Sequence, residues 1–248
     1  EAFVKDLQTG AIEVASLNAA GQLTGVGIVA LSGQAISDDG RYVVYASNAG
    51  NIVPGVGSGT IQVYVRDLAT DTTTLASRSA AGAAANSQSD LGAISPNGRF
   101  VSFRSFATNL AGGPFASRVY VHDRVTLATG SVPLPVLNAV TATGCRENDV
   151  ADNGVVVLTC FFGSGLFDQV YLHIPGAAGT PFLISSDIND VAGNQVSGTR
   201  VAIDASGLSM IFDSLASNLV GNDFNGVSDS FILIDEGILD GIFADSFE

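Results

Sequence analysis

Two short motifs recur along the chain in the same rhythm, and this repetition limits the folds that the chain can adopt. The first motif is an apolar run such as Val63-Tyr64-Val65-Arg66-Asp67, and copies of it start at positions 2, 119, 170 and, more weakly, 230. The second motif is a turn whose glycine lies at positions 40, 98, 154 and 207. The glycines are 58, 56 and 53 residues apart. A nearly constant period of roughly 50–60 residues is typical of propellers and solenoids, in which each repeat is one supersecondary unit.

Each copy of the second motif indicates a strand, a tight turn and a second strand. Asp39-Gly40 and Asn97-Gly98 supply the positive φ angles that tight hairpins require. The residues after the first turn alternate, with Tyr42 and Val44 on one face of the expected strand. The first motif adds a third strand, and a turn then leads into a fourth. The sequence therefore predicts an all-β fold of four-stranded antiparallel blades.

The motifs resemble the repeats of TolB-like propellers, also called WD40-like propeller repeats. Ser95-Pro96-Asn97-Gly98-Arg99-Phe100 and the Val-Tyr-Val-Arg-Asp run at 63–67 carry the resemblance, which covers nearly the whole chain. In the family's order, strands A and B flank the Asx-Gly turn, and strands C and D follow it. The resemblance implies a single β-propeller domain over residues 1–248, with an N-terminal half-blade, about four blades and a C-terminal tail. The expected bounds are 1–20 for the half-blade, starts at about 33, 91, 145 and 199 for the blades, and 236–248 for the tail.

Residues 236–248 resemble the short acidic-aromatic C-terminal tails of secreted gammaproteobacterial proteins. We therefore expect a secreted protein, located outside the cell, on its surface or in the periplasm of a Gram-negative bacterium, with Glu248 as its natural C-terminus. The sequence begins without a signal peptide, so either a leader has been removed or the chain starts inside a longer precursor. The longest stretch without charge, 14–37, carries too many polar residues for a transmembrane segment.

The charge balance narrows the class of partner. The formal net charge is −14, with 24 acidic and 10 basic residues. Such a chain repels phosphate backbones and anionic lipid surfaces, so nucleic acid and anionic membranes are disfavoured as partners. The expected partner is a protein, including copies of the chain itself.

The two cysteines, Cys145 and Cys160, lie at equal distances from the turn at Asp152-Asn153. An ideal two-residue hairpin places them directly opposite each other, within reach of a disulfide. The alternative is that both are reduced. A disulfide would indicate an oxidising compartment.

One loop has the ligand spacing of a calcium site. Asp223, Asn225 and Asp229 place side-chain oxygens at its first, third and seventh positions, and the carbonyl of Val227 is a fourth candidate ligand. Family repeats often carry a similar loop between strands B and C. The alternative is an Asx turn stabilised by its own side chains, with no bound Ca²⁺.

The histidines offer little support for catalysis. His122 and His173 occupy the repeat position that holds Lys5 and Arg66 in other copies, so we expect solvent-facing strand sites. Two histidines also give little basis for a Ser-His-Asp triad or a His-rich metal site. The recurring Ser47, Ser105 and Ser214 are interpreted as structural hydrogen-bonding groups in the B–C connection.

These observations favour a non-enzymatic secreted propeller that binds a protein partner or assembles with itself through β-strand pairing, in the extended case into an extracellular filament. The alternative is a secreted hydrolase that uses carboxylates on the propeller face. The N-terminal run at 2–6 has no A and B strands before it. We expect it to pair with the sheet that contains 208–213, either in the same chain or in a neighbouring copy.

Overall fold

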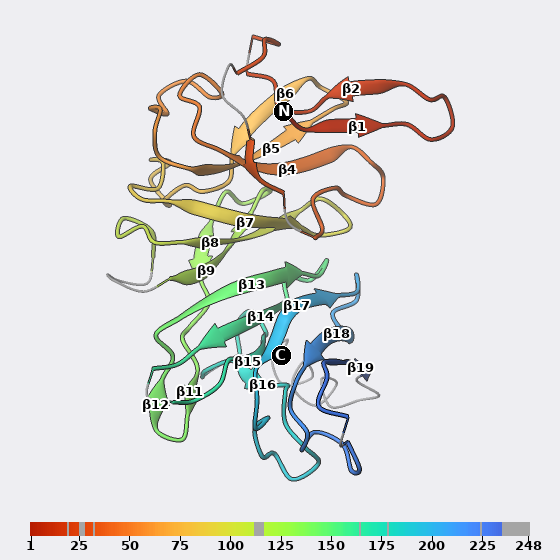
Figure 1. Cartoon of the computed structure of the whole chain (residues 1–248). Helices are drawn as coiled ribbons and strands as arrows, with labels where there is room; N and C mark the ends of the chain where they lie inside the picture. Colours follow the sequence, from red (N-terminus) through yellow and green to blue (C-terminus); the bar gives the residue numbers. More distant parts are fainter. Residues whose placement is uncertain are drawn as a thin grey trace, which may run out of the picture. The chain divides into compact units, whose positions relative to one another are not determined.

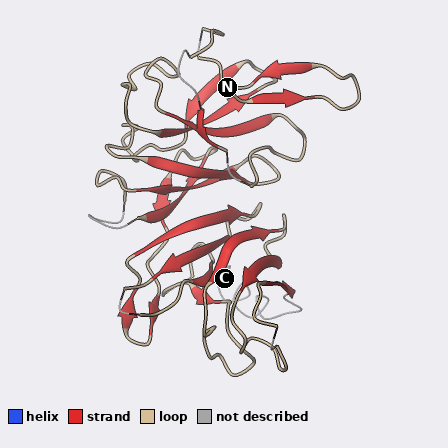
Figure 2. Cartoon of the chain, viewed as in Figure 1, coloured by secondary structure: helices blue, strands red, loops and turns tan. Residues whose placement is uncertain are grey.

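The computed structural model describes residues 1–18, 20–24, 28–31, 33–111, 117–163, 165–177, 179–223 and 225–234. Every regular element in these residues is a β-strand (Figure 1, Figure 2). The chain divides into two compact units. One contains residues 1–115 and 120–131, and the other contains 116–119 and 132–248.

The first unit contains a hairpin and two four-stranded antiparallel blades. The hairpin consists of β1 (Phe3–Lys5) and β2 (Ile12–Val14). The first blade consists of β3 (Ile28–Ala30), β4 (Tyr42–Ser47), β5 (Gln62–Asp67) and β6 (Thr72–Leu75). The second consists of β7 (Ser89–Ile94), β8 (Phe100–Ser105), β9 (Arg118–Asp123) and β10 (Thr129–Ser131). In both blades the strands lie side by side in chain order, as A, B, C and D.

The second unit repeats the pattern. A small hairpin joins β11 (Val136–Leu137) to β12 (Val140–Thr141). The third blade consists of β13 (Gly144–Val150), β14 (Val156–Phe161), β15 (Gln169–His173) and β16 (Phe182–Leu183). The fourth sheet consists of β17 (Ser197–Ile203), β18 (Ser209–Ser214) and β19 (Asp229–Ile234).

The prediction of four-stranded antiparallel blades is confirmed for the first three sheets. Their first strands begin at 28, 89 and 144, and that of the fourth begins at 197, close to the expected starts. The fourth sheet has only three strands among the described residues, so β19 forms its edge there. The expected tail at 236–248 lies outside the described residues. No helix in the described part of the chain is long and apolar enough to cross a membrane.

Each blade has two faces that differ in their neighbours. In the first and third blades, we call the face that meets the next sheet of the same unit the forward face, and the opposite one the rear face. The equivalent faces of the other sheets take the same names. Val44 pairs with Val65 on the forward face of the first blade, and both belong to one core cluster with Ile94 and Phe103 of the second blade. In the second unit, Val157 and its partner Leu172 pack in the same way with residues of the fourth sheet. Stacking of this kind buries the main apolar core of each unit.

Glycines allow this close stacking. A Cβ atom on Gly92, in β7, would lie 2.8 Å from Val63 Cγ1 and 3.0 Å from Val44 Cγ2. A Cβ atom on Gly198, in β17, would lie 2.5 Å from Val170 Cγ2. Both glycines sit where the A strand departs from regular register against its B strand. In each unit, the A strand of the second blade or sheet therefore lies directly on the forward face of the blade before it.

The N-terminal hairpin packs on the rear face of the first blade. Ala2, Ala15 and Val4 form a small apolar cluster with Val43 of β4 and Leu68. Within the chain, β1 pairs with β2 and not with the sheet that contains 208–213. Pairing of residues 2–6 with that sheet in a neighbouring copy stays a prediction. All six residues of β18 pair with β19, and its other edge pairs with β17. The strand at 229–234 therefore fills the edge that the prediction left open.

Candidate functional site

The cysteines form the expected cross-strand pair. Cys145 in β13 lies opposite Cys160 in β14, and their sulfurs are bonded. The register that brings them together differs from an ideal hairpin, because Val150 pairs with Val156 and the register shifts between Cys145 and Asn148. The turn is thus longer than two residues, and one bulge restores the opposition of the two cysteines.

The candidate calcium loop is held by its own side chains. The Val227 amide donates to Asn225 Oδ1 at 2.9 Å, and Asn225 Nδ2 donates to both carboxylate oxygens of Asp229 at 3.2 Å. The amide of Asn225 approaches Asp223 Oδ1 at 3.5 Å. These contacts match the Asx-turn alternative, and calcium binding at Asp223, Asn225, Val227 and Asp229 stays a prediction.

The expected solvent exposure of the Lys/Arg/His position is wrong in two copies. Arg66 and His122 are 1% and 3% exposed. Arg66 donates to the carbonyl of Asp71 at 2.7 Å and also pairs with the Asp71 carboxylate, while His122 Nδ1 lies 3.0 Å from Thr129 Oγ1. Burial, with Arg78 and Arg124 nearby, lowers the pKa of His122 to about 4. The position faces the following D strand and its turn, so these side chains have structural partners.

The recurring serines are structural, as interpreted from their spacing. The hydroxyls of Ser47, Ser105 and Ser214 are buried and accept hydrogen bonds from the amides two residues further on, at 3.2, 3.1 and 3.0 Å. These bonds fix the chain as it leaves each B strand.

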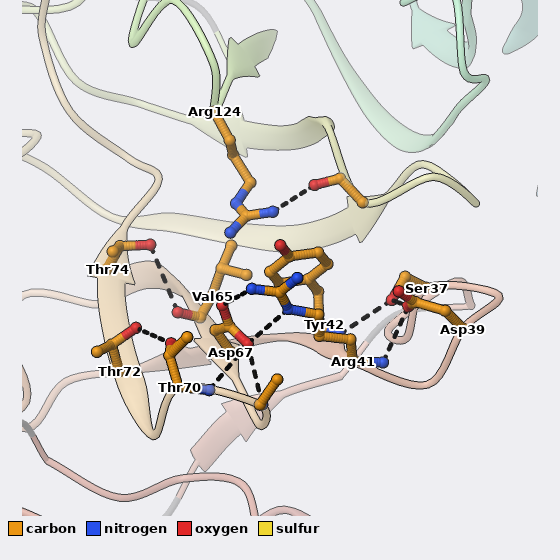
Figure 3. Close-up of polar contacts among 12 residues, drawn as sticks. Ser37, Asp39, Arg41, Tyr42, Val65, Asp67, Thr70, Thr72, Thr74 and Arg124 are labelled. Atoms are coloured by element: carbon orange, nitrogen blue, oxygen red, sulfur yellow. Dashed lines mark hydrogen bonds and ion pairs between the residues drawn. The ribbon is translucent and has the colours of Figure 1, made fainter.

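Two arginines that follow the turn glycines tie strand B to strand C. Arg41 donates through Nε and Nη2 to the two carboxylate oxygens of Asp67 at 2.8 and 2.7 Å (Figure 3). Arg99 makes the equivalent two-point contact with Asp123 at 3.1 and 2.8 Å. The guanidinium groups hold the pKa of Asp67 and of Asp123 well below their usual range. Both carboxylates are thereby kept as ionised partners of structural arginines.

Tyr42 connects the two blades of the first unit at the same end. The Arg124 guanidinium carbon lies 3.9 Å from the centroid of the Tyr42 ring, and Arg124 also donates to the Gly98 carbonyl (Figure 3). A Cβ atom on Gly98 would lie 2.3 Å from Tyr42 Cδ2. The second turn glycine is therefore needed for contact with the preceding blade as well as for its positive φ.

The forward face of the fourth sheet is apolar and exposed. Ile211 pairs with Ile232 at the positions of Val44 and Val65, and Ile211, Ile232 and Ile234 are 43%, 69% and 64% exposed. A shallow depression of about 370 Å³ is lined by Ile211, Ile232, Met210 and Asp204, among others. Singly exposed apolar residues are normal, but a cross-strand row beside a depression indicates an interaction surface.

The rear face of the N-terminal hairpin is a second such surface. Phe3 pairs with Val14, and Lys5 pairs with Ile12, so these four side chains share the face opposite the cluster on Val43. Phe3 and Ile12 are 62% and 63% exposed. Removing apolar side chains from water is favourable, so these residues on the free face of the hairpin favour a covered state.

Comparison with known proteins gives matches among solved structures only. No family model matches, and no curated protein matches. A protein assigned as TolB of Agrobacterium tumefaciens has a TM-score of 0.43, 13% identity and coverage of 80% of this chain and 64% of its own. A prolyl endopeptidase matches with a TM-score of 0.48 and 14% identity, over 94% of this chain and 33% of its own. The hydrazine synthase of Kuenenia stuttgartiensis matches with a TM-score of 0.36 and 15% identity, over 80% of this chain and 48% of its own. The chain thus spans less than two thirds of each of these proteins.

The strand order and registers of the blades decide the fold assignment. The chain is all-β and is built from repeats that each form an antiparallel blade. In these repeats, sequence reasoning found the strands and the cysteine pair, but it missed the exposed rows at Ile211–Ile232 and Phe3–Ile12. The one signal available was the strand C copy at 2–6 without preceding A and B strands.

Proposed function

We propose that this chain is a non-enzymatic, secreted propeller-repeat protein that binds protein, and that its partner is another copy of itself. The observation that carries the proposal is that the first and last sheets of the described chain are both incomplete. Among the described residues, β1 and β2 pair only with each other, and the three-stranded sheet leaves an apolar row exposed. Repeats that stack on their neighbours need covered ends, and a second copy supplies a cover of the same kind.

Three observations support the non-enzymatic and secreted parts of the proposal. The carboxylates of Asp67 and Asp123 are held by arginines, and His122 is buried against Thr129. The Cys145–Cys160 disulfide suits an oxidising compartment. The net charge of −14 favours a protein partner over an anionic one.

Self-association in solution tests the proposal. Light scattering coupled to size-exclusion chromatography, over a wide range of protein concentrations, should show species larger than the monomer of 25.2 kDa. Electron microscopy of the same fractions should show assemblies of regular repeat, which in the extended case are filaments. A monodisperse monomer at every concentration would overturn the self-assembly proposal. Turnover of glycan or ester substrates, abolished by acid-to-amide variants, would establish the hydrolase alternative.

A further inference from the structure

The exposed row on the fourth sheet corresponds to positions that are fully covered elsewhere in the chain. Val44 and Val65 are 0% and 1% exposed, and Val157 and Leu172 are 0% and 3% exposed. They are covered because a following blade stacks on them. The registers place Ile211 and Ile232 at the same two positions. The fourth sheet therefore presents a surface whose shape and chemistry, inside the chain, fit another repeat of the same kind.

The free face of the N-terminal hairpin corresponds to the other half of that contact. Phe3 occupies the strand C position of Tyr64, Tyr120 and Phe231, by alignment of the repeated motif. These aromatic residues lie on rear faces, where each packs beside an aromatic residue of strand B. In the described part of the chain β1 pairs with β2 alone, so Phe3 lacks a strand B neighbour there and is exposed.

We propose that the rear face of the hairpin β1–β2 in one copy docks on the forward face of the sheet β17–β18–β19 in a second copy. This inference rests on the proposed self-assembly and specifies its surfaces. Inside the second unit, Phe231 and Leu233 of strand C pack against the cluster that contains Leu172 of the preceding blade. By the same geometry, Phe3 of one copy contacts Ile232 of the next.

Charge agrees with this choice of occupant. Lys5, the single lysine of the chain, lies on the same face of the hairpin as Phe3 and Ile12. Asp204 borders the depression beside Ile211 and Ile232. The proposed contact thus brings one basic side chain of the hairpin to a surface that is bordered by one acidic side chain.

Cross-linking of two separately labelled variants tests the contact. Phe3→Cys is made in one preparation and Ile232→Cys in another. In each variant the introduced cysteine is the single free thiol, because Cys145 and Cys160 are bonded to each other. The variants are mixed and treated with a short bis-maleimide. We expect a covalent dimer from the mixture and much less from either variant alone.

Matched substitutions give a second, independent readout. Ile232→Asp and Phe3→Asp should each weaken association at least tenfold, as measured by light scattering against concentration. Ile188→Asp and Leu7→Asp are the controls, since these residues are 97% and 88% exposed and lie outside the two rows. Both controls should associate like the wild type. Circular dichroism and thermal melts check that all four variants are folded.

The outcomes separate this inference from the proposal beneath it. A wild type that stays monomeric overturns both. A wild type that associates, with no mixed cross-link and with unaltered association of Ile232→Asp and Phe3→Asp, overturns the docking contact alone. A double variant, Phe3→Cys with Ile232→Cys, that cross-links only within a monomer shows closure inside one chain and also overturns it. If the wild type associates but a variant without residues 236–248 is monomeric, the occupant of the exposed row at Ile211 and Ile232 would be this tail and not the hairpin.

Discussion

At the scale of single residues, Asp149 is a buried carboxylate, and in the described part of the chain no basic side chain pairs with it. Its side chain lies at the seam between the third and fourth sheets, where Oδ2 accepts a hydrogen bond from the Ile203 amide at 3.0 Å and Oδ1 accepts one from the Val150 amide at 2.9 Å. Burial raises its pKa to about 6, although both hydrogen bonds act in the opposite direction. Two amide donors therefore offset only part of the desolvation cost of the charged form.

Asp149→Asn should stabilise the protein at neutral pH. The folded-state pKa lies above the unfolded value, so the stability linked to this group is complete below about pH 4 and is lost as the pH rises through about 6. A shift of this size corresponds to about 2–3 kcal/mol. Chemical denaturation should show a higher free energy of unfolding for the variant than for the wild type at pH 7.5, and equal values at pH 4. Glu13→Gln, at an exposed carboxylate, is the control, and an equal gain at both pH values would contradict the assignment.

Calcium binding at Asp223, Asn225, Val227 and Asp229 predicts a specific thermal response. Adding Ca²⁺ should raise the Tm, because an ion that binds only the folded state stabilises it. Asp223→Ala should abolish the rise, whereas Asp190→Ala, in a different exposed loop, should keep it. An unchanged Tm in the wild type would leave the loop as an Asx turn held by the Asn225–Asp229 contact.

At the scale of elements, equivalent turns have different neighbours. Gly40 and Gly98 have φ angles of 72° and 75°, but only Gly98 lies against another blade, where Tyr42 covers it. The backbone requirement for glycine is thus shared, and the packing requirement is not. A pair of substitutions can separate the two.

Gly40→Ala should cost about 1–2 kcal/mol in unfolding free energy, because an L side chain is strained at positive φ. Gly98→Ala should cost about 1–3 kcal/mol more, since its Cβ must displace the Tyr42 ring. Urea denaturation of both variants measures the difference. Equal losses would show that the Tyr42 contact contributes nothing to stability.

The hairpin β13–β14 should depend on its disulfide. The cysteines are 15 residues apart, and a cross-link of that span is worth about 3 kcal/mol in the chain-entropy model. The double variant Cys145→Ser, Cys160→Ser should lose stability on that scale. Titration of the denatured, unreduced wild type should find no free thiol, and two thiols would contradict the pairing.

The sequence predicted the elements well because their signals are local. Alternation around Tyr42 and the Asx-Gly turn at Asn97-Gly98 are sufficient to place strands A to C. The burial of Arg66 and the bulge beside Cys145 were not predicted, because both depend on which strand or turn lies alongside. Residues 2–6 do not pair with 208–213 inside the chain, because two strand C copies competed for one edge and 229–234 occupies it. Pairing between copies stays a prediction.

At the scale of the whole molecule, charge opposes association. Copies that each carry a net charge of −14 repel one another, and one lysine at the proposed contact offsets little of this. Association should therefore strengthen as NaCl is raised from low to physiological concentration and beyond, because salt screens the repulsion. Light scattering at fixed protein concentration measures the effect. Weaker association at high salt would indicate that attraction between opposite charges dominates the contact.

The two exposed rows are different surfaces. One lies on the hairpin β1–β2 and the other on the sheet β17–β18–β19, and Figure 1 shows the strands of both. A contact between unlike surfaces gives every assembly two chemically distinct ends and a direction, and it does not stop by itself unless it closes into a ring. Growth could then be arrested from one end only. A variant with an intact hairpin and Ile232→Asp would bind the end that presents the sheet β17–β18–β19. Its own sheet would not bind the hairpin of the next copy. Added in trace amounts, it should shorten assemblies in proportion to its share, like a chain terminator.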